Sequence, residues 1–312
     1  MRQAVVPKPR PCASADPDYV RGVVLVALAG GFWSLGGLLV RLVEAASGWQ
    51  IILFRSLALV LTLLLIVALR HRGRLVTAFR QVGLNGAAAG TALGGGFIGF
   101  VLALQHTSVA NATFMLGASP FLAALLGRLI LGERVRRVTL LGMVLTAIGI
   151  LVMVSGGLVL GTVAGNLLAL GASCCFSIFS VLLRRGQHDM LPCAAIAGAA
   201  AALIAFPMVV NEASSISAAL LPSARDTALC AVMGSVQVGL GLTLFTAGAR
   251  HVPAAELALL SMTELVLAPI WVWLGVGEVP SGFTLIGGAL VLLAIALRAL
   301  SDARRPVPPA LV

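Results

Sequence analysis

The sequence predicts an all-α integral membrane protein, with ten transmembrane helices arranged as two antiparallel five-helix inverted repeats. Three observations predict this fold class. The 312 residues are 60% hydrophobic and only 10% charged, with a mean hydropathy of +1.07, whereas a soluble domain carries about 25% charged residues. Apolar stretches of about 20 residues, the length that spans a bilayer, recur along the chain. A sequence pattern around residue 133 also returns 145 residues later.

The spans follow one another with short connections. The ten predicted transmembrane segments are 20–43, 49–69, 82–104, 108–131, 137–155, 161–184, 191–211, 226–249, 253–277 and 281–300. A proline-rich stretch precedes the first segment, arginine clusters follow the second, fourth and sixth, and Ser155-Gly-Gly closes the fifth. In the second half, Pro192, Pro222 and Pro280 mark the connections around the seventh, eighth and tenth segments.

The internal repeat is the strongest clue to the architecture. Residues 129–145 and residues 274–290 agree at seven positions when an offset of 145 is applied. In the first copy these positions are Leu129, Gly132, Glu133, Thr139, Leu140, Gly142 and Leu145. Many secondary transporters are built from such internal duplications, with one copy set against the other around a central site. The repeat therefore favours a transporter.

Charge indicates the orientation. With the amino terminus placed inside, the inner segments hold 17 arginine and lysine residues, and the outer ones hold two, Arg41 and Arg225. Positive residues collect on the cytoplasmic side of membrane proteins, so both termini are expected in the cytoplasm and the protein in the inner membrane. The net charge of +10 is spread over short loops, which predicts no nucleic-acid partner.

Orientation and repeat together predict the domain organisation. Each copy holds five spans, an odd number, so the second copy starts on the opposite side of the membrane from the first. The expected units are a flexible cytoplasmic tail at 1–19, a first repeat at 20–155, a second repeat at 161–300 and a cytoplasmic tail at 301–312.

Several of these residues form the motifs of a known family. They are the pairs Gly132-Glu133 and Gly277-Glu278, the pair Ser119-Pro120, and Arg55 in the second span. With them the chain resembles the drug/metabolite transporter superfamily, in its ten-helix branch with two EamA-type repeats, over about residues 20–300. It departs at Glu264-Leu265, where the family often has Glu-Pro, and Pro269 follows one turn later. Any bend in the ninth span is therefore expected to be displaced.

The resemblance implies a secondary transporter that exports small metabolites by alternating access. The chain looks most like bacterial exporters of amino acids, including aromatic ones; drugs or other metabolites such as nucleobases are the alternative substrates. Four-helix relatives pair as antiparallel dimers, so a fused duplication implies a monomer whose partners are a small-molecule substrate and membrane lipid. The competing hypothesis, from another functional class, is that the protein is a membrane-embedded enzyme or a channel. No catalytic, metal-binding or nucleotide-binding motif can be assembled, so no catalytic residue, metal or cofactor is expected.

Glu264 is the sharpest candidate for a site residue because it lies near the middle of the ninth span. A charged side chain there costs about 2.5–3.5 kcal/mol unless it reaches water or a partner, so it is expected to face a cavity. Helical spacing places Leu260 and Trp271 on the same stripe. The offset maps this stripe onto Asn111, Met115 and Ser119 in the fourth span. The alternative is a structural glutamate bonded to a neighbouring helix.

Other mid-membrane residues complete the candidate cavity. Arg55 is expected to act as a carboxylate clamp or gate together with Glu264. The alternative is that its side chain reaches the membrane interface or pairs with Glu44. Gln237 is expected to bind a zwitterionic substrate or, alternatively, a neighbouring helix. Trp33, with Ser34 beside it, is expected to stack on an aromatic or aliphatic substrate or, alternatively, to face lipid. Gly94 is expected to lie on the face of the third span that lines the cavity. The alternative is that it permits close packing against another helix.

Overall fold

A computed structural model describes residues 17–132, 137–156, 160–186, 190–216, 220–252 and 254–303, and within these ranges the regular structure is helical. The helices are α1 (Pro17–Ser34), α2 (Gly36–Arg41), α3 (Gly48–Arg70), α4 (Leu75–His106), α5 (Val109–Leu116), α6 (Ser119–Leu131), α7 (Arg137–Ser155), α8 (Leu160–Gly186), α9 (Met190–Ile216), α10 (Ala224–Val232), the π-helix η2 (Met233–Leu240), α11 (Gly241–Gly248), α12 (Ala254–Val276) and α13 (Gly282–Ala303). Glu133 and most of the two predicted tails lie outside the described residues.

The membrane class predicted from composition is confirmed. Nine helical segments of the described chain are long and apolar enough to cross a membrane. They coincide with every predicted span except the ninth. The ninth coincides with α12, which contains the apolar stretch Thr263–Val276.

Local sequence determines where the helices begin and end. A capping box opens α3, because the Ser47 hydroxyl accepts from the Gln50 N–H while the Gln50 side chain accepts from the Ser47 N–H. The hydroxyls of Ser108 and Ser223 cap α5 and α10. Gly132 ends α6 with a φ of 69°, a left-handed conformation that glycine adopts without steric cost.

Several predicted spans are not single regular helices. The first is divided at Leu35 into α1 and α2, and the fourth is divided at Gly117-Ala118 into α5 and α6. In α4, Gly83 has φ 61° and ψ −173°, so a kink separates the first turns from the rest. The eighth span contains the π-helix η2 between α10 and α11. Irregular backbone at membrane depth occurs where protein or a cavity satisfies it, frequently at functional sites.

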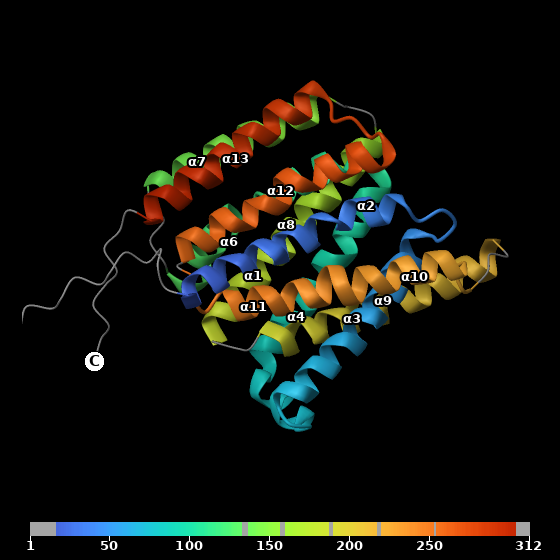
Figure 1. The fold of residues 1–312 in the computed structure, drawn as a ribbon. Helices are drawn as coiled ribbons and strands as arrows, with labels where there is room; N and C mark the ends of the chain where they lie inside the picture. The colour runs from blue at the N-terminus through green and yellow to red at the C-terminus, as the bar shows by residue number, and fades with distance from the viewer. Residues whose placement is uncertain are drawn as a thin grey trace, which may run out of the picture.

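Helices from the two halves of the sequence pack against each other. Figure 1 shows α7 and α13 side by side at one edge of the molecule, where α13 also contacts α12 and α5. Elsewhere α3 packs against α9, α8 packs against α4 and α6, and α1 packs against α11 and α12. Apart from the contact of α13 with α12, every one of these contacts joins the first half of the chain to the second. The two halves therefore share one core.

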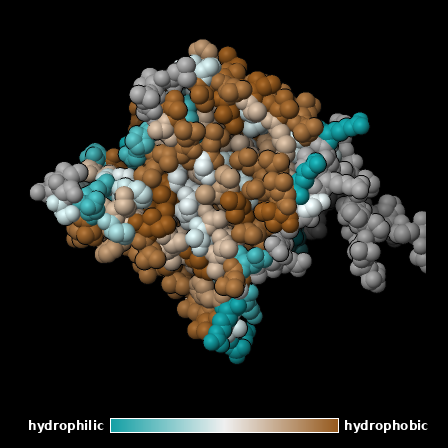
Figure 2. All heavy atoms as spheres, turned by 180° about the vertical axis from the view of Figure 1, so that it is seen from behind, coloured by the Kyte–Doolittle hydropathy of each residue, from teal (hydrophilic) through white to brown (hydrophobic). Residues whose placement is uncertain are grey.

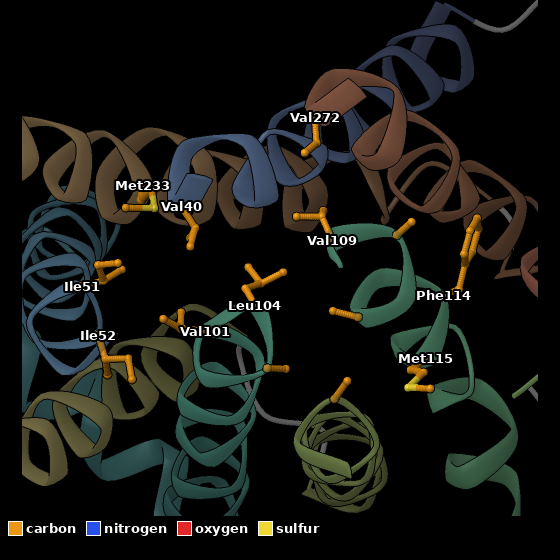
Figure 3. Close-up of a cluster of buried hydrophobic side chains, with 14 of the residues drawn as sticks. Val40, Ile51, Ile52, Val101, Leu104, Val109, Phe114, Met115, Met233 and Val272 are labelled. Carbon is orange, nitrogen blue, oxygen red and sulfur yellow. The ribbon is translucent and has the colours of Figure 1, made fainter. Parts of the chain in front are cut away.

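That core is made of side chains from several spans. Figure 3 shows Val40 of α2, Ile52 of α3, Leu104 of α4, Met115 of α5 and Val272 of α12 within one buried cluster. The cluster surrounds the ends of the broken helices. Packing of this kind holds interrupted backbone in place because protein interiors are as dense as organic crystals.

The outer surface is apolar along the spans. On α3, exposed leucines recur every four residues at positions 57, 61, 65 and 69. Figure 2 shows hydrophobic atoms over most of one face of the molecule, with hydrophilic atoms gathered at its edges and tips. Such a continuous apolar surface fits contact with lipid tails, since soluble monomers rarely expose patches of that size.

Candidate functional site

The break between α1 and α2 is held by a polar contact to α12. Ser34, the last residue of α1, is completely buried. Its hydroxyl donates to the carbonyl oxygen of Gly31 at 2.6 Å and accepts from the indole N–H of Trp271 at 3.0 Å. The indole has only this one donor, so the bond orients the Trp271 ring toward the break. Two predicted site residues therefore meet here.

Gln237 reaches the same break from η2. Its amide nitrogen donates to the carbonyl oxygen of Trp33 at 3.1 Å. Its amide oxygen is buried and has no hydrogen-bond partner among the described residues. Buried polar atoms are nearly always paired, so this oxygen is a ready acceptor for a ligand donor. The Trp33 ring packs on Phe245 with centroids 5.2 Å apart and supplies an aromatic wall.

Glu264 lies in the middle of α12, where α1 approaches closely. A β-carbon on Gly30 would lie 3.5 Å from the carbonyl oxygen of Leu260 and 3.9 Å from the backbone nitrogen of Glu264. The Glu264 side chain is half-buried, and its carboxyl group makes no hydrogen bond or ion pair with any described residue. Carboxylates at membrane depth usually pair or face water. Glu264 is therefore free to meet a ligand or a proton.

Arg55 of α3 is buried, with 5% of its surface exposed. Its guanidinium donates to the Phe97 carbonyl oxygen at 3.4 Å, and its Cζ lies 5.3 Å from the centroid of the Phe97 ring, which meets Phe176 edge-on. The alternative prediction that Arg55 pairs with Glu44 is wrong, because Glu44 pairs with Arg225. A guanidinium has five donors, so one long hydrogen bond leaves most of them open to an anionic group.

Two residues of the predicted fourth-span stripe belong to the packed core. The Asn111 amide oxygen accepts from the Thr284 hydroxyl at 2.7 Å, and its amide nitrogen donates to the Thr107 hydroxyl at 3.4 Å. Met115 is completely buried in the cluster of Figure 3. These contacts join α5 to α13 and to the end of α4, so they account for both residues without a ligand.

The third residue of that stripe and the predicted glycine also have protein neighbours. The carbonyl oxygen of Ser119 accepts from the Ser177 hydroxyl of α8 at 2.8 Å. A β-carbon on Gly94 would lie 2.7 Å from the carbonyl oxygen of Ala197, so Gly94 permits close packing of α4 on α9. The structure thus brings Trp33, Ser34, Gln237 and Trp271 together at the α1–α2 break and sets the backbone of Leu260 and Glu264 against α1 at Gly30. It places Arg55, Gly94, Asn111, Met115 and Ser119 in other surroundings.

A second polar cluster joins the two halves, and it was not predicted as a site. Arg41 at the end of α2 donates through Nε to Glu278 at 2.8 Å, and through its other nitrogens to the carbonyl oxygens of Leu104 and Thr107 at 2.7 and 2.9 Å. The second carboxylate oxygen of Glu278 accepts from the Val109 N–H at 2.7 Å. This Arg41–Glu278 cluster binds the α4–α5 connection to the loop before α13.

The repeat carried a signal for this cluster. Glu278 matches Glu133 at an offset of 145, and Arg41 matches Arg184 at an offset of 143. Two charges of opposite sign that are both duplicated are candidates for one interaction. Glu133 and the side chain of Arg184 lie outside the described part of the chain.

The chemistry available at the α1–α2 break is recognition rather than covalent chemistry. It offers the amide oxygen of Gln237 and the rings of Trp33 and Trp271, and the carboxyl group of Glu264 lies further along α12. Among the described residues, no group of three or more His, Cys, Asp and Glu side chains could hold a metal ion.

Known proteins match this chain over most of its length. The pseudopaline exporter CntI of Pseudomonas aeruginosa is 28% identical over 282 residues, which cover 88% of this chain and 94% of that protein. The uncharacterized transporter YyaM of Bacillus subtilis is 26% identical over 205 residues, which cover 63% of this chain and 66% of that protein. A crystal structure that is 20% identical in sequence shares the fold, with a TM-score of 0.66 over 92% of this chain and 100% of that one.

The family assignment rests on both halves of the chain. The sequence profile of the EamA-like transporter family matches residues 20–155 and again residues 163–300. Together with the apolar helices of the described chain and the bacterial relatives, this double match identifies the chain as a transporter rather than an enzyme, and it belongs to the EamA-like transporter family of the drug/metabolite transporter superfamily.

Proposed function

We propose that this protein is a secondary transporter that exports small amino-acid-like metabolites across the inner membrane, by alternating access of two inverted repeats. The observation that carries the proposal is the unpaired carboxyl group of Glu264, in the stretch of α12 that packs against α1 next to Gly30. Irregular helices at the membrane midplane are where transporters of this construction bind substrate. The carboxyl group would bind a substrate ammonium group or carry a coupling proton.

Reciprocal contacts support an inverted arrangement of the repeats. A β-carbon on Gly22 would lie 2.8 Å from the Cβ of His251, and one on Gly165 would lie 2.7 Å from the carbonyl carbon of His106. Gly22 corresponds to Gly165, and His106 to His251, at offsets of 143 and 145. Exchanging the two halves of the chain therefore converts the Gly22–His251 contact into the Gly165–His106 contact, as a pseudo-two-fold axis requires.

The helix pairs follow the same exchange. The contact of α1 with α11 corresponds to that of α8 with α4, and the contact of α1 with α12 corresponds to that of α8 with α6. The pairs α3–α9 and α7–α13 each join two corresponding helices and map onto themselves. A rocking motion of one repeat against the other would change these contacts in matched pairs, so a single chain would suffice for transport.

Complementary groups support an amino-acid-like substrate. Glu264 and the unpaired amide oxygen of Gln237 suit an ammonium group, and the aromatic ring of Trp33 suits an apolar side chain. Arg55 has donors for a carboxylate. One relative is named as an exporter of pseudopaline, which makes that compound a second substrate to test beside the amino acids.

Counterflow in proteoliposomes tests the proposal. The wild-type protein should show saturable counterflow of labelled phenylalanine that depends on pH. Glu264→Gln keeps the shape of the side chain but cannot titrate. If Glu264 binds the substrate ammonium group, substrate affinity should fall about 10- to 100-fold, the value of one charge-assisted hydrogen bond; if it carries a coupling proton, proton-driven net export should be abolished. Glu44→Gln, which changes a carboxylate in an exposed ion pair, is the matched control and should transport normally.

Each part of the proposal can fail separately. Normal rates and pH dependence in Glu264→Gln would make that residue structural. Flux without saturation or counterflow in the wild type would indicate a channel. Transport of pseudopaline, drugs or nucleobases but of no amino acid would leave the transporter standing and change its substrate class.

A further inference from the structure

A basic hollow lies where α3 ends and α4 begins. It has a volume of about 330 Å³ and is lined by Arg70, His71, Arg72, Arg74, Thr77 and Gln81. The lining is made entirely of basic or hydrogen-bonding side chains. The three arginines are exposed and make no side-chain hydrogen bond or ion pair with any described residue.

A tight turn between α3 and α4 determines the shape of the basic hollow. Arg72 and Gly73 have φ values of 50° and 80°, so the chain reverses within a few residues. The N–H of Gly73 donates to Ala68 at 2.8 Å, and the N–H of Arg74 donates to His71 at 3.0 Å. These backbone bonds hold the arginines around the hollow and do not occupy their side chains.

The charge of the hollow is not balanced nearby in sequence. Residues 45–132 contain no aspartate or glutamate at all. Exposed arginines without carboxylate partners attract anions, and the flat guanidinium fork fits the oxygens of a phosphate group. The Thr77 hydroxyl and the Gln81 amide add neutral hydrogen-bonding groups to the lining.

The surroundings point to a lipid. The hollow lies between the membrane spans Gly48–Arg70 and Leu75–His106, hence at the membrane boundary. Leu69 and Val76 beside it are 72% and 68% exposed, and Leu84, just after the kink at Gly83, is 92% exposed. Figure 2 shows hydrophilic atoms gathered at the tip where Figure 1 places the α3–α4 turn, next to hydrophobic atoms. A headgroup in the hollow would leave its acyl chains against this apolar surface.

We propose that the basic hollow is a binding site for the phosphate-bearing headgroup of an anionic phospholipid. Inorganic phosphate shares the headgroup's chemistry but lacks the acyl chains that the exposed apolar residues would contact. Bound lipid would hold the α3–α4 turn, and with it the start of α4, at the membrane surface. The site is remote in sequence from the residues grouped at the α1–α2 break and does not depend on how substrate binds.

The test compares two double variants of the full-length protein that remove the same charge. Arg72→Gln with Arg74→Gln removes two arginines of the hollow, and Arg80→Gln with Arg128→Gln removes two exposed arginines that do not line it. Binding of phosphatidylglycerol is measured by native mass spectrometry after titration of the detergent-solubilised protein. Thermal unfolding is followed in the presence of phosphatidylglycerol, phosphatidylcholine or inorganic phosphate.

The hollow variant should bind phosphatidylglycerol about 30-fold more weakly than the wild type, as expected for two lost basic groups near a membrane surface. The control variant should bind it like the wild type. Phosphatidylglycerol should raise the melting temperature of the wild type and of the control, whereas phosphatidylcholine and inorganic phosphate should not. Equal loss in both double variants, or equal protection by inorganic phosphate, would overturn the proposal.

Discussion

Two ion pairs of this protein differ in burial, and this difference predicts how much each contributes to the stability of the fold. Arg41 and Glu278 have side chains that are 28% and 24% exposed, and backbone groups satisfy the rest of both. Glu44 and Arg225 form a pair whose side chains are 70% and 54% exposed. Exposed pairs gain little because water screens them, whereas a half-buried, fully bonded pair loses several bonds when one partner changes.

We therefore predict that Glu278→Gln destabilises the protein by about 1–3 kcal/mol. The amide can still accept from the Val109 N–H, but the charge that holds Arg41 is lost. Thermal unfolding in detergent, followed by intrinsic fluorescence, measures the effect. Glu44→Gln serves as the control and should leave the melting temperature unchanged. Equal melting temperatures for the two variants would show that the Arg41–Glu278 cluster does not hold the halves together.

The sequence predicted which residues at the candidate site were unusual, but not which of them already had partners. Glu264 and Gln237 stood out because polar side chains at membrane depth are costly. The repeat offset selected Asn111, whose amide is used by Thr284 and Thr107. Hydrogen bonds between helices far apart in sequence depend on how the helices rotate against each other, and hydropathy does not determine that rotation.

At the scale of whole elements, hydropathy located the spans while local chemistry located only some of their breaks. Pro120 forbids a regular backbone bond and lies just after the break between α5 and α6. Gly83 takes a left-handed φ that marks the kink in α4. Glycines also mark the other two irregular places, since Gly36 and Gly37 follow the break at Leu35 and Gly234 and Gly239 lie within η2, but glycine is common in membrane spans and does not by itself predict a break. Sequence reasoning therefore predicted continuous helices there.

Close helix approach gives a prediction at this scale. Gly94→Ala would place a methyl group 2.7 Å from the Ala197 carbonyl oxygen, so α4 and α9 must separate. We expect a loss of about 1–3 kcal/mol in stability, as for overpacked cores. Gly171→Ala in α8 is the matched control, because nothing lies within 4 Å of its β-carbon position; it should be neutral or slightly stabilising. Thermal unfolding of both variants makes the comparison, and an unchanged melting temperature for Gly94→Ala would contradict the close packing.

At the scale of the whole molecule, composition predicted a membrane protein because 10% charged residues cannot cover a soluble surface. The repeat predicted that the chain has two related halves, and the family profile matches both. Which helices from the two halves meet could not be predicted, since ten spans allow many packings. The pairing of α7 with α13, which lie side by side in Figure 1, is an example.

The orientation of the halves gives the last prediction. Reporters fused after Arg74 and Arg137 should be active in the cytoplasm, and reporters fused after Ala46 and Leu221 should be active on the outer side. These sides are expected because arginine-rich connections usually stay inside and because the proposal makes the second repeat inverted relative to the first. If the reporter after Arg74 is active on the outer side, the basic hollow would lie at the outer leaflet and not at the cytoplasmic one. If the reporters after Ala46 and Leu221 are active on opposite sides of the membrane, the number of spans between them is odd, and the two five-helix repeats cannot be antiparallel.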